Sequence, residues 1–263
     1  MHIAKRSPIV DVNGEAVVKD ALKLLSQRIE QPARRAFLQR SLTLGGLAML
    51  SGCSITDDAS VETALQSISR FNDRVQGWLL DPTQLAPTYA ESMITRPFPF
   101  NAYYSEAEIR EVDGDAWRLE VTGLVADKRR WTLAELSELP QQEQVTRHIC
   151  VEGWSAIGKW GGVPFADLLK RVGADLSAKY VGFKCADGYY TSIDMATALH
   201  PQTILALSHD GQTLPSRHGY PVKLRMPTKL GYKNPKHINA IFVTNTYPGG
   251  YWEDQGYNWF GGS

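Results

Sequence analysis

Hydrophobic and polar residues alternate along several short stretches of the chain, which is the pattern of strands that bury one face. We expect strands at 117–123, 144–151, 179–185, 189–193, 203–208, 222–226 and 239–245. Asp187 and Gly188 stand between two of these stretches and predict a hairpin turn, because this pair readily adopts the left-handed backbone that such a turn needs.

A longer spacing of hydrophobic residues predicts a helix over 61–80. Its apolar positions fall on one helical face: Val61, Leu65, Ile68, Val75 and Leu79. Asp81-Pro82 ends this helix, since the residue before a proline avoids the helical region. The Pro-rich stretch 81–106 shows no period, and we expect it to wrap over the main domain because its aromatic residues need cover.

Two shorter helices are marked by their ends. Thr132 and Glu135 form a capping box that opens a helix, and Pro140 ends it. Pro164 at the start and Gly173 past the end bracket another helix. Helices mixed with irregularly spaced strands and long loops predict an α+β fold.

Length and charge narrow the class of protein. The 263 residues are 43% hydrophobic, enough for one large domain or two small ones with a buried core. The 28 basic residues balance the 28 acidic ones. Binding to nucleic acid or to an anionic membrane surface needs a basic excess, so we expect neither.

The stretch around residue 40 resembles an export signal. Arg34 and Arg35 precede an apolar run, 42–50, that is far shorter than the ~20 residues of a membrane-spanning helix. This order is similar to signals of the twin-arginine route. Leu50 to Cys53, "LSGC", looks like a bacterial lipobox. A buried amphipathic helix is the alternative interpretation.

This interpretation divides the chain into three parts. We expect a leader at 1–53, an N-terminal helix and wrapping segment at 54–97, and a main domain at 98–263. The protein would be periplasmic, exported already folded and attached to the membrane only through a lipid on Cys53. Such export suits a protein that acquires a cofactor in the cytoplasm.

The chain has few cysteines, and its composition alone does not decide whether they form a disulfide, bind a metal or act as a nucleophile. The chain has Cys53, Cys150 and Cys185. A Cys150–Cys185 disulfide is compatible with an oxidising compartment. A zinc site has little support, because no C-x-x-C occurs and the histidines are scattered. Ser155 lies in a segment one residue too long for a hydrolase nucleophile elbow, whereas a Cys nucleophile with a His base remains open.

The residues after Cys150 carry the most specific pattern of the chain. This pattern, "CVEGWSAIGKWGGVPFADLL", is followed in order by "AKYVGFKCADGYYTSIDMATALHPQTILAL", "HGYPVKLRMPTKLGYKNPKHI" and "GGYWEDQGYNWF". Together these segments resemble the sulfite-oxidase superfamily of molybdenum enzymes. They are especially similar to the branch of the bacterial periplasmic protein-methionine-sulfoxide reductase catalytic subunits. The likeness covers residues 98–263.

The resemblance implies a role for the lone thiol. Cys150 would be the thiolate ligand and catalytic centre of a molybdenum ion held by a single molybdopterin, the Mo-molybdopterin cofactor. High-valent molybdenum is well served by anionic sulfur, and a metal-bound thiol is deprotonated. One cysteine suffices because the pterin supplies two further sulfurs.

The resemblance also implies which residues touch the cofactor. They are Asn101, Tyr104, Ser105, Cys185, His218, Lys223, Asn234, Pro235 and Lys236. Three of them differ from relatives: Ser105 stands where the reductase branch has an acidic residue, Cys185 where it has threonine, and Lys223 where arginine is frequent.

A basic loop at 229–237 is expected to serve the pterin phosphate. Lys229, Lys233 and Lys236 lie close together in sequence around Gly231 and Asn234, and they would supply cations. The alternative is a solvated basic loop. Arg225 would either add its charge to the same site or face outward.

The implied activity is a two-electron oxygen-atom transfer on a small or protein-borne substrate that is sulfoxide-like or sulfite-like. Electrons would pass through an external haem-containing or quinone-linked membrane partner, since the chain has no C-x-x-C-H and no iron–sulfur cysteine set. The C-terminal immunoglobulin-like domain of longer relatives is not expected, so we predict a monomer. The placement of Arg147 and Arg217, which would favour sulfite, stays open.

Two other classes of protein remain as alternatives. One is a lipid-anchored binding protein that keeps the fold without redox activity. The other is a structural domain with a disulfide between Cys150 and Cys185.

Overall fold

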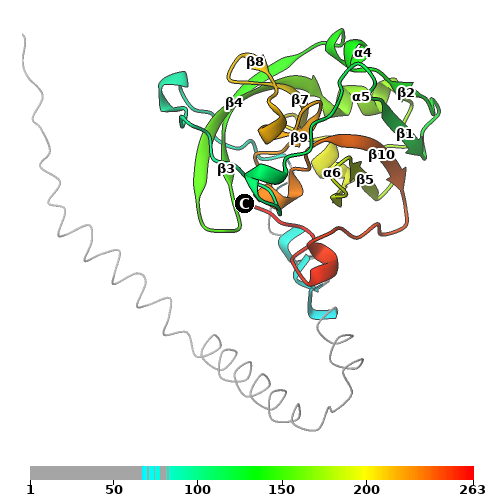
Figure 1. Cartoon of the computed structure of the whole chain (residues 1–263). Coiled ribbons are helices and arrows are strands. Elements are labelled where there is room, and N and C mark those ends of the chain that lie inside the picture. Colours follow the sequence, from blue (N-terminus) through cyan, green and yellow to red (C-terminus); the bar gives the residue numbers. More distant parts are fainter. Residues whose placement is uncertain (1–66, 70, 74, 78–80, 82) are drawn as a thin grey trace, which may run out of the picture. The chain divides into compact units, whose positions relative to one another are not determined.

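The computed structural model describes residues 67–69, 71–73, 75–77, 81 and 83–263 (Figure 1). The chain divides into two units, 1–63 and 64–263, and every described residue belongs to the second. The predicted export signal and Cys53 lie outside the described residues. In the described part, no helix has both the length and the apolar character needed to cross a membrane.

Two five-stranded sheets form the domain (Figure 1). The first has the order β2 (Arg130–Trp131), β1 (Leu119–Gly123), β10 (Ile238–Thr244), β5 (Tyr180–Cys185) and β6 (Tyr190–Asp194). The second has the order β3 (Gln142–Ile149), β4 (Ser155–Pro164), β7 (Ile204–His209) and β8 (Gln212–Thr213), with β9 (Lys223–Arg225) also paired to β7. β1 and β10 are parallel and the other pairs are antiparallel. The predicted α+β class with mixed strands is confirmed.

Helices are short and connect the sheets. They are α4 (Leu133–Ser137), α5 (Phe165–Arg171) and α6 (Met195–Ala198), with 3₁₀ turns η2 (Glu91–Met93), η3 (Glu106–Glu108), η4 (Ser216–His218), η5 (Gly231–Lys233) and η6 (Glu253–Gln255). The predicted capping box opens α4: Thr132 Oγ1 accepts from the Glu135 amide, and the Glu135 carboxylate accepts from the Thr132 amide. Pro164 caps α5, which ends before Gly173 as predicted.

The main hydrophobic core draws on both sheets and on α4, α5 and α6. Trp131, Phe165 and Phe183 are essentially inaccessible there. Burying a side chain of this size contributes roughly 1.5–3 kcal/mol to stability. A smaller cluster, built around Phe98 and Trp160, packs on the second sheet. The main core therefore joins the two sheets, and the smaller cluster packs on the second sheet alone.

The N-terminal segment packs against the second sheet. The Tyr89 amide donates to the Val145 carbonyl at 3.0 Å, and the Thr95 amide donates to the Ile157 carbonyl at 2.9 Å. The stretch therefore wraps over the domain, as expected. The described residues between 67 and 77 are helical, but Ile68 is 57% exposed, so the predicted apolar face is not buried at this position.

β4 is the long strand that the pattern did not predict. Its glycines obscure the alternation, yet one of them is required by the sheet. A Cβ at Gly162 would lie 2.0 Å from the Leu205 carbonyl oxygen, and the β4–β7 register shifts between Gly161 and Gly162. A bulge of this kind leaves room only for glycine.

Candidate active site

β3 delivers Cys150 to the centre of the domain. Side chains alternate along the strand, so Thr146, His148 and Cys150 share one buried face while Arg147 faces away. The chain then turns sharply into β4, where the Cys150 amide donates to the Trp154 carbonyl at 2.9 Å. Gly153 permits this turn with a φ of +92°. The prediction that a strand places Cys150 at its end is confirmed.

The sulfur of Cys150 is buried and contacts two polar side chains. Asn101 Nδ2 lies 3.2 Å from Sγ, and Glu152 Oε2 lies 3.6 Å from it. Trp154 Nε1 donates to the same Glu152 oxygen at 2.8 Å and orients the carboxylate. Burial raises the pKa of the Cys150 thiol. A thiolate at this position therefore needs a cationic partner such as a metal ion.

A cavity of about 140 Å³ opens beside this sulfur. It is lined by segments 101–104, 150–152, 231–232 and 234–236, by Asp187 and Tyr189 of the β5–β6 hairpin, and by Trp252 and Tyr257. Tyr104 Oη lies 3.2 Å from Asp187 Oδ2, and burial raises the pKa of this phenol. Several aromatic rings line the cavity, and the charges at the cavity are those of Glu152, Asp187 and Lys236.

Two buried cations lie behind the cavity with neutral partners. Lys223 Nζ donates to the Asn234 carbonyl at 3.1 Å. Arg225 donates to the Thr146 hydroxyl at 3.2 Å and to the Arg147 carbonyl at 2.6 Å. Burial lowers the pKa of Lys223, and it lowers the pKa of Arg225 to about 9. A buried charge without a counter-ion is costly, so an anion would be strongly stabilised here.

The buried side chain of His148 has no hydrogen-bond partner on either ring nitrogen among the described residues. Burial lowers its pKa, with Arg225 and Lys223 adding to the effect, so the ring is neutral and keeps one donor and one acceptor. The backbone comes close on one side, since a Cβ at Gly231 would lie 2.8 Å from Nε2. A buried group of this kind needs a partner, and a ligand bound beside His148 would supply one.

These residues fit a phosphate-bearing cofactor that binds metal through sulfur. Cys150 supplies an anionic sulfur donor, Lys223 and Arg225 supply uncompensated positive charge, and His148 supplies free hydrogen-bonding capacity. The site thus has the donor set expected for a molybdopterin with one protein thiolate.

Several predicted contacts do meet at the cavity. Asn101, Tyr104, Asn234, Pro235 and Lys236 line it together with Cys150. The Asn234 carboxamide is also structural, because its Oδ1 accepts from the Met226 amide at 2.7 Å. Lys236 Nζ lies 4.5 Å from the centre of the Phe100 ring, and burial lowers its pKa to about 8.

The other predicted contacts lie outside the cavity lining. Ser105 is exposed, and its hydroxyl donates to Glu108 Oε2 at 2.7 Å at the start of η3. Cys185 is buried at the end of β5. His218 packs edge-on against Phe98 with ring centroids 5.4 Å apart. Lys223 stands in the layer of cations behind the wall. Their contact with the cofactor stays a prediction.

The prediction that three lysines of the basic loop cluster at one site is wrong. Lys233 is fully buried in an ion pair with Glu253. Lys229 points to Asp194 and to the Phe260 carbonyl, away from Cys150. Only Lys236 of these three lines the cavity. The 3₁₀ turn η5 rotates neighbouring side chains into different directions, which proximity in sequence does not reveal. Arg225 faces inward.

Sequence reasoning missed His148, Glu152 and Asp187 as site residues. Glu152 follows Cys150 by two positions, and His148 precedes it by two on the same strand face, so the strand period was a usable signal. Asp187 was recognised only as a turn residue. Arg147 and Arg217 both lie outside the cavity lining, and Arg217 pairs with Glu106 at 2.9 Å.

Both described cysteines, Cys150 and Cys185, are free thiols. The structural alternative of a Cys150–Cys185 disulfide is therefore not what the structure shows. Within the described ranges, no group of three or more His, Cys, Asp and Glu side chains is arranged to hold a metal ion. Cys150 would thus need a cofactor to complete the coordination of a metal.

Comparisons with known proteins agree with this donor set. The family model described as oxidoreductase molybdopterin binding domain matches residues 106–252, more than half of the chain. A candidate protein-methionine-sulfoxide reductase subunit of Azospira oryzae, YedZ1, is 74% identical over 263 residues, covering 100% of both chains. The protein-methionine-sulfoxide reductase catalytic subunit MsrP of Ralstonia nicotianae is 29% identical, covering 66% of this chain and 62% of its own.

A solved structure shares the fold. The sulfane dehydrogenase SoxCD from Paracoccus pantotrophus superposes with a TM-score of 0.50 at 21% sequence identity. The match covers 52% of this chain and 40% of the SoxCD chain. At this identity the likeness concerns the arrangement of strands and helices alone.

Proposed function

This chain belongs to the oxidoreductases with a molybdopterin-binding domain, in the sulfite-oxidase superfamily, and from that premise we propose that it reduces methionine sulfoxide carried by proteins. The reaction would remove the oxygen of R₂S=O, consume two electrons and two protons, and yield R₂S and water. The relatives named as protein-methionine-sulfoxide reductase subunits support this choice of substrate.

The roles of the site residues follow from their positions. When bound, the molybdenum cofactor supplies a centre that accepts an oxygen atom and cycles by two electrons. Cys150 would hold the metal, while Asn101 Nδ2, 3.2 Å from the sulfur, donates to the thiolate and fixes its direction. Lys223 and Arg225 would balance the cofactor phosphate, and His148 would hydrogen-bond to the cofactor.

The single observation that carries the substrate assignment is the charge of the cavity. Its lining contains two carboxylates, Glu152 and Asp187, against one cation, Lys236, and no arginine. Lys223 and Arg225, behind the wall, would be neutralised by the cofactor phosphate. An anion such as sulfite would then meet the excess negative charge of the lining, whereas a neutral sulfoxide would not be repelled. The aromatic walls suit a thioether side chain, since sulfur packs favourably against rings.

The test uses holoprotein purified from molybdenum-replete cells. We expect about one molybdenum per chain. Benzyl viologen reduced by dithionite should drive reduction of N-acetyl-methionine sulfoxide and of a peroxide-oxidised, methionine-rich protein. Sulfite oxidation with ferricyanide should be at least about a hundredfold slower in kcat/KM. Metal-loaded protein that reduces neither sulfoxide refutes the proposal.

We further propose that the protein works in the periplasm, reached by the twin-arginine route, with Cys53 as the lipid attachment site and an external electron donor. Replacing Arg34 and Arg35 together by lysine should retain the protein in the cytoplasm, as cell fractionation would show. Cys53→Ala should still be exported but should be released in soluble form. Unchanged fractionation of both variants would contradict this part of the proposal.

A further inference from the structure

The mouth of the Cys150 cavity carries exposed apolar side chains. Val151 is 49% exposed and Tyr257 is 38% exposed, and both line the cavity. Exposed apolar side chains beside a binding site are typical of surfaces that contact another protein. The cavity of about 140 Å³ is also smaller than most sites for small organic molecules, which have roughly 300–1,000 Å³. It therefore admits one side chain, and the neighbouring residues of a polypeptide substrate would lie against this mouth.

Three carboxylates surround the mouth, each from a different segment of the chain. Glu152 and Asp187 line the cavity itself. Asp254 lies in the chain between two other lining residues, Trp252 and Tyr257. Glu152 and Asp254 are exposed and Asp187 is half-buried, so all three can act on a group outside the cavity.

These carboxylates are hydrogen-bonded but not neutralised. Within the described residues, none of the three forms an ion pair. The side-chain donors that they accept from are uncharged: Trp154 Nε1 to Glu152 at 2.8 Å, Tyr104 Oη to Asp187 at 3.2 Å and Tyr190 Oη to Asp254 at 2.6 Å. An uncharged donor leaves the charge of a carboxylate in place, and the two oxygens offer about four acceptor positions.

Two cations near the mouth do not balance these charges. Lys236 lines the cavity, and its Nζ donates to the Arg217 carbonyl at 3.1 Å. The Arg217 guanidinium pairs with Glu106 at 2.9 Å. Of these two cations, only Lys236 is left to oppose three carboxylates, so the mouth keeps an excess of negative charge.

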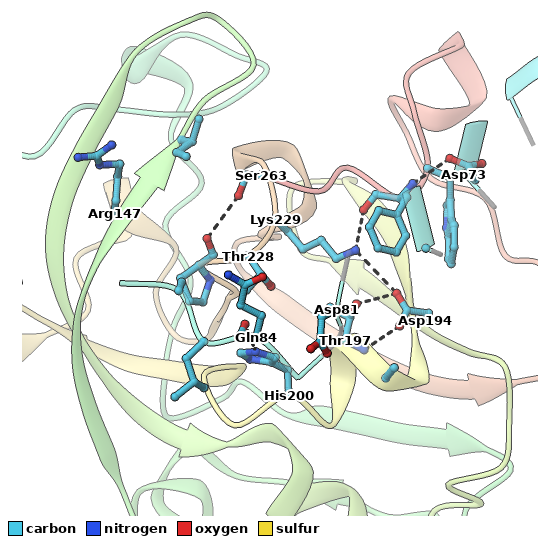
Figure 2. Close-up of a pocket in the computed structure, with 18 of the residues that line it drawn as sticks. Asp73, Asp81, Gln84, Arg147, Asp194, Thr197, His200, Thr228, Lys229 and Ser263 are labelled. Atoms are coloured by element: carbon cyan, nitrogen blue, oxygen red, sulfur yellow. Dashed lines mark hydrogen bonds and ion pairs between the residues drawn. The ribbon is translucent and has the colours of Figure 1, made fainter. Parts of the chain in front are cut away.

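A larger cavity, of about 890 Å³, shows a different arrangement of charge (Figure 2). Arg147 of β3 lines it, as do Asp194 and Lys229. Asp194 lies 3.8 Å from Lys229 Nζ, so a cation of the chain already partners this acid. At the mouth of the Cys150 cavity, a cation of the substrate would have to take that place.

From this charge and shape we propose that the site favours methionine sulfoxide whose neighbours in the polypeptide are lysine or arginine. The proposal rests on the proposed function and names the substrate class within it. Residues of an extended peptide follow one another at about 3.4 Å, so the long side chains beside the sulfoxide reach the carboxylates of the mouth. Complementary charge acts mainly on the association rate and on specificity, so the preference belongs to kcat/KM.

Turnover of three pentapeptides, blocked at both ends, tests this preference. Each has methionine sulfoxide at its centre, flanked on both sides by lysine, by alanine or by glutamate. With holoprotein and reduced benzyl viologen at low salt, kcat/KM should be at least about fivefold higher for the lysine peptide than for the glutamate peptide. The alanine peptide should lie between them. Salt at about 0.5 M should narrow the ratio, because the interacting charges are exposed.

Single substitutions assign the preference to the mouth. Asp187→Asn and Asp254→Asn keep the size of the side chain and remove its charge, so each should lower the lysine-to-glutamate ratio of kcat/KM at least about twofold. The ratio compares two peptides on one preparation, so a partial loss of cofactor cancels from it. Asp167→Asn makes the same substitution on the exposed side of α5, outside the lining, and should keep the parental ratio.

The outcomes separate the inference from the proposed function. Reduction of all three peptides with similar kcat/KM overturns the inference and leaves the function standing. A ratio that neither mouth variant changes, or that falls equally in Asp167→Asn, also overturns it. Loaded protein that reduces no peptide refutes the proposed function. Isothermal titration with the corresponding unoxidised methionine peptides then decides the inference: tighter binding of the lysine peptide supports it, and equal binding overturns it.

Discussion

At the scale of single residues, Cys150 is distinguished by its surroundings from Cys185, the other buried thiol of the described residues. Asn101 and Glu152 contact its sulfur, and the cavity opens beside it. Cys185 packs instead within the hydrophobic core. The two cysteines therefore provide a matched pair for separating metal binding from folding.

We predict that Cys150→Ser gives a folded protein that has lost its metal. Serine keeps the size of the side chain, but an alkoxide ligand is far less available than a thiolate at neutral pH. Plasma mass spectrometry should find less than about a tenth of the normal molybdenum, with a near-normal circular dichroism spectrum. Cys185→Ala should keep the metal and cost about 1 kcal/mol of stability. Full molybdenum content in Cys150→Ser would exclude the assignment of this ligand.

His148→Phe should have opposite effects on the empty and loaded proteins. The ring shape is kept, while two unpaired buried nitrogens disappear, so the apoprotein should be as stable as the parent or up to about 2 kcal/mol more stable. The loaded protein should lose cofactor faster on gel filtration, because its hydrogen bond to the cofactor is gone. Thermal unfolding of both forms and pterin fluorescence of the released material provide the measurement. Slower cofactor loss would show that His148 does not contact it.

At the scale of elements, the β4–β7 pairing depends on a glycine for a backbone reason. We predict that Gly162→Ala destabilises the protein by more than about 2 kcal/mol, because its Cβ would lie 2.0 Å from the Leu205 carbonyl oxygen. Gly153→Ala is the control, since its Cβ would meet no atom within 4 Å and only its positive φ costs about 1 kcal/mol. Urea unfolding compares the two. Equal losses would mean that the close approach in β4 is relieved by movement of the strand.

Helices and strands could be predicted from the sequence where the hydrophobic pattern or the capping ability of their side chains marks them. Alternation located β1, β3, β5, β6, β7, β9 and β10, and hydrogen-bonding side chains located the start of α4. β4 was missed because Gly158, Gly161 and Gly162 have no side chain to alternate.

The candidate site was only partly predictable for a similar reason. Motif resemblance identified Asn101, Tyr104 and Lys236, which do line the cavity. The resemblance did not show where the side chains of the lysines around η5 point, because in a 3₁₀ turn this depends on tertiary packing. His148 and Glu152 were within reach of the strand period around Cys150, but their significance depends on burial, which only the folded chain reveals.

At the scale of the whole molecule, buried cations make the stability of the apoprotein depend on pH. Burial lowers the pKa of Lys236 and of Lys229 to about 8 from the usual 10.5. Between these values the unfolded chain binds more protons than the folded one, so stability rises with pH. Above about pH 10 the buried tyrosines Tyr189 and Tyr232, whose pKa values burial raises, reverse the trend.

We therefore predict that the melting temperature of the apoprotein rises from pH 7.5 to about 9.5, and that Lys236→Met removes part of this rise. In the loaded protein the cofactor anion would restore the lysine pKa, so the rise should be smaller. Lys128→Met, on the exposed β1–β2 loop, is the control and should follow the parent. A melting temperature that falls steadily over this range in the apoprotein would contradict the assignment of uncompensated buried charge.

The order of segments around the Cys150 cavity has a consequence for biosynthesis. Its wall begins at Asn101 and includes Trp252 and Tyr257, whose rings lie 4.9 Å apart in a segment that the Lys233–Glu253 pair anchors. A nascent chain on the ribosome has its thiol ready about a hundred residues before this wall can form. The pterin must therefore enter after translation has passed residue 257, so insertion competes with final closure of the domain, not with early folding.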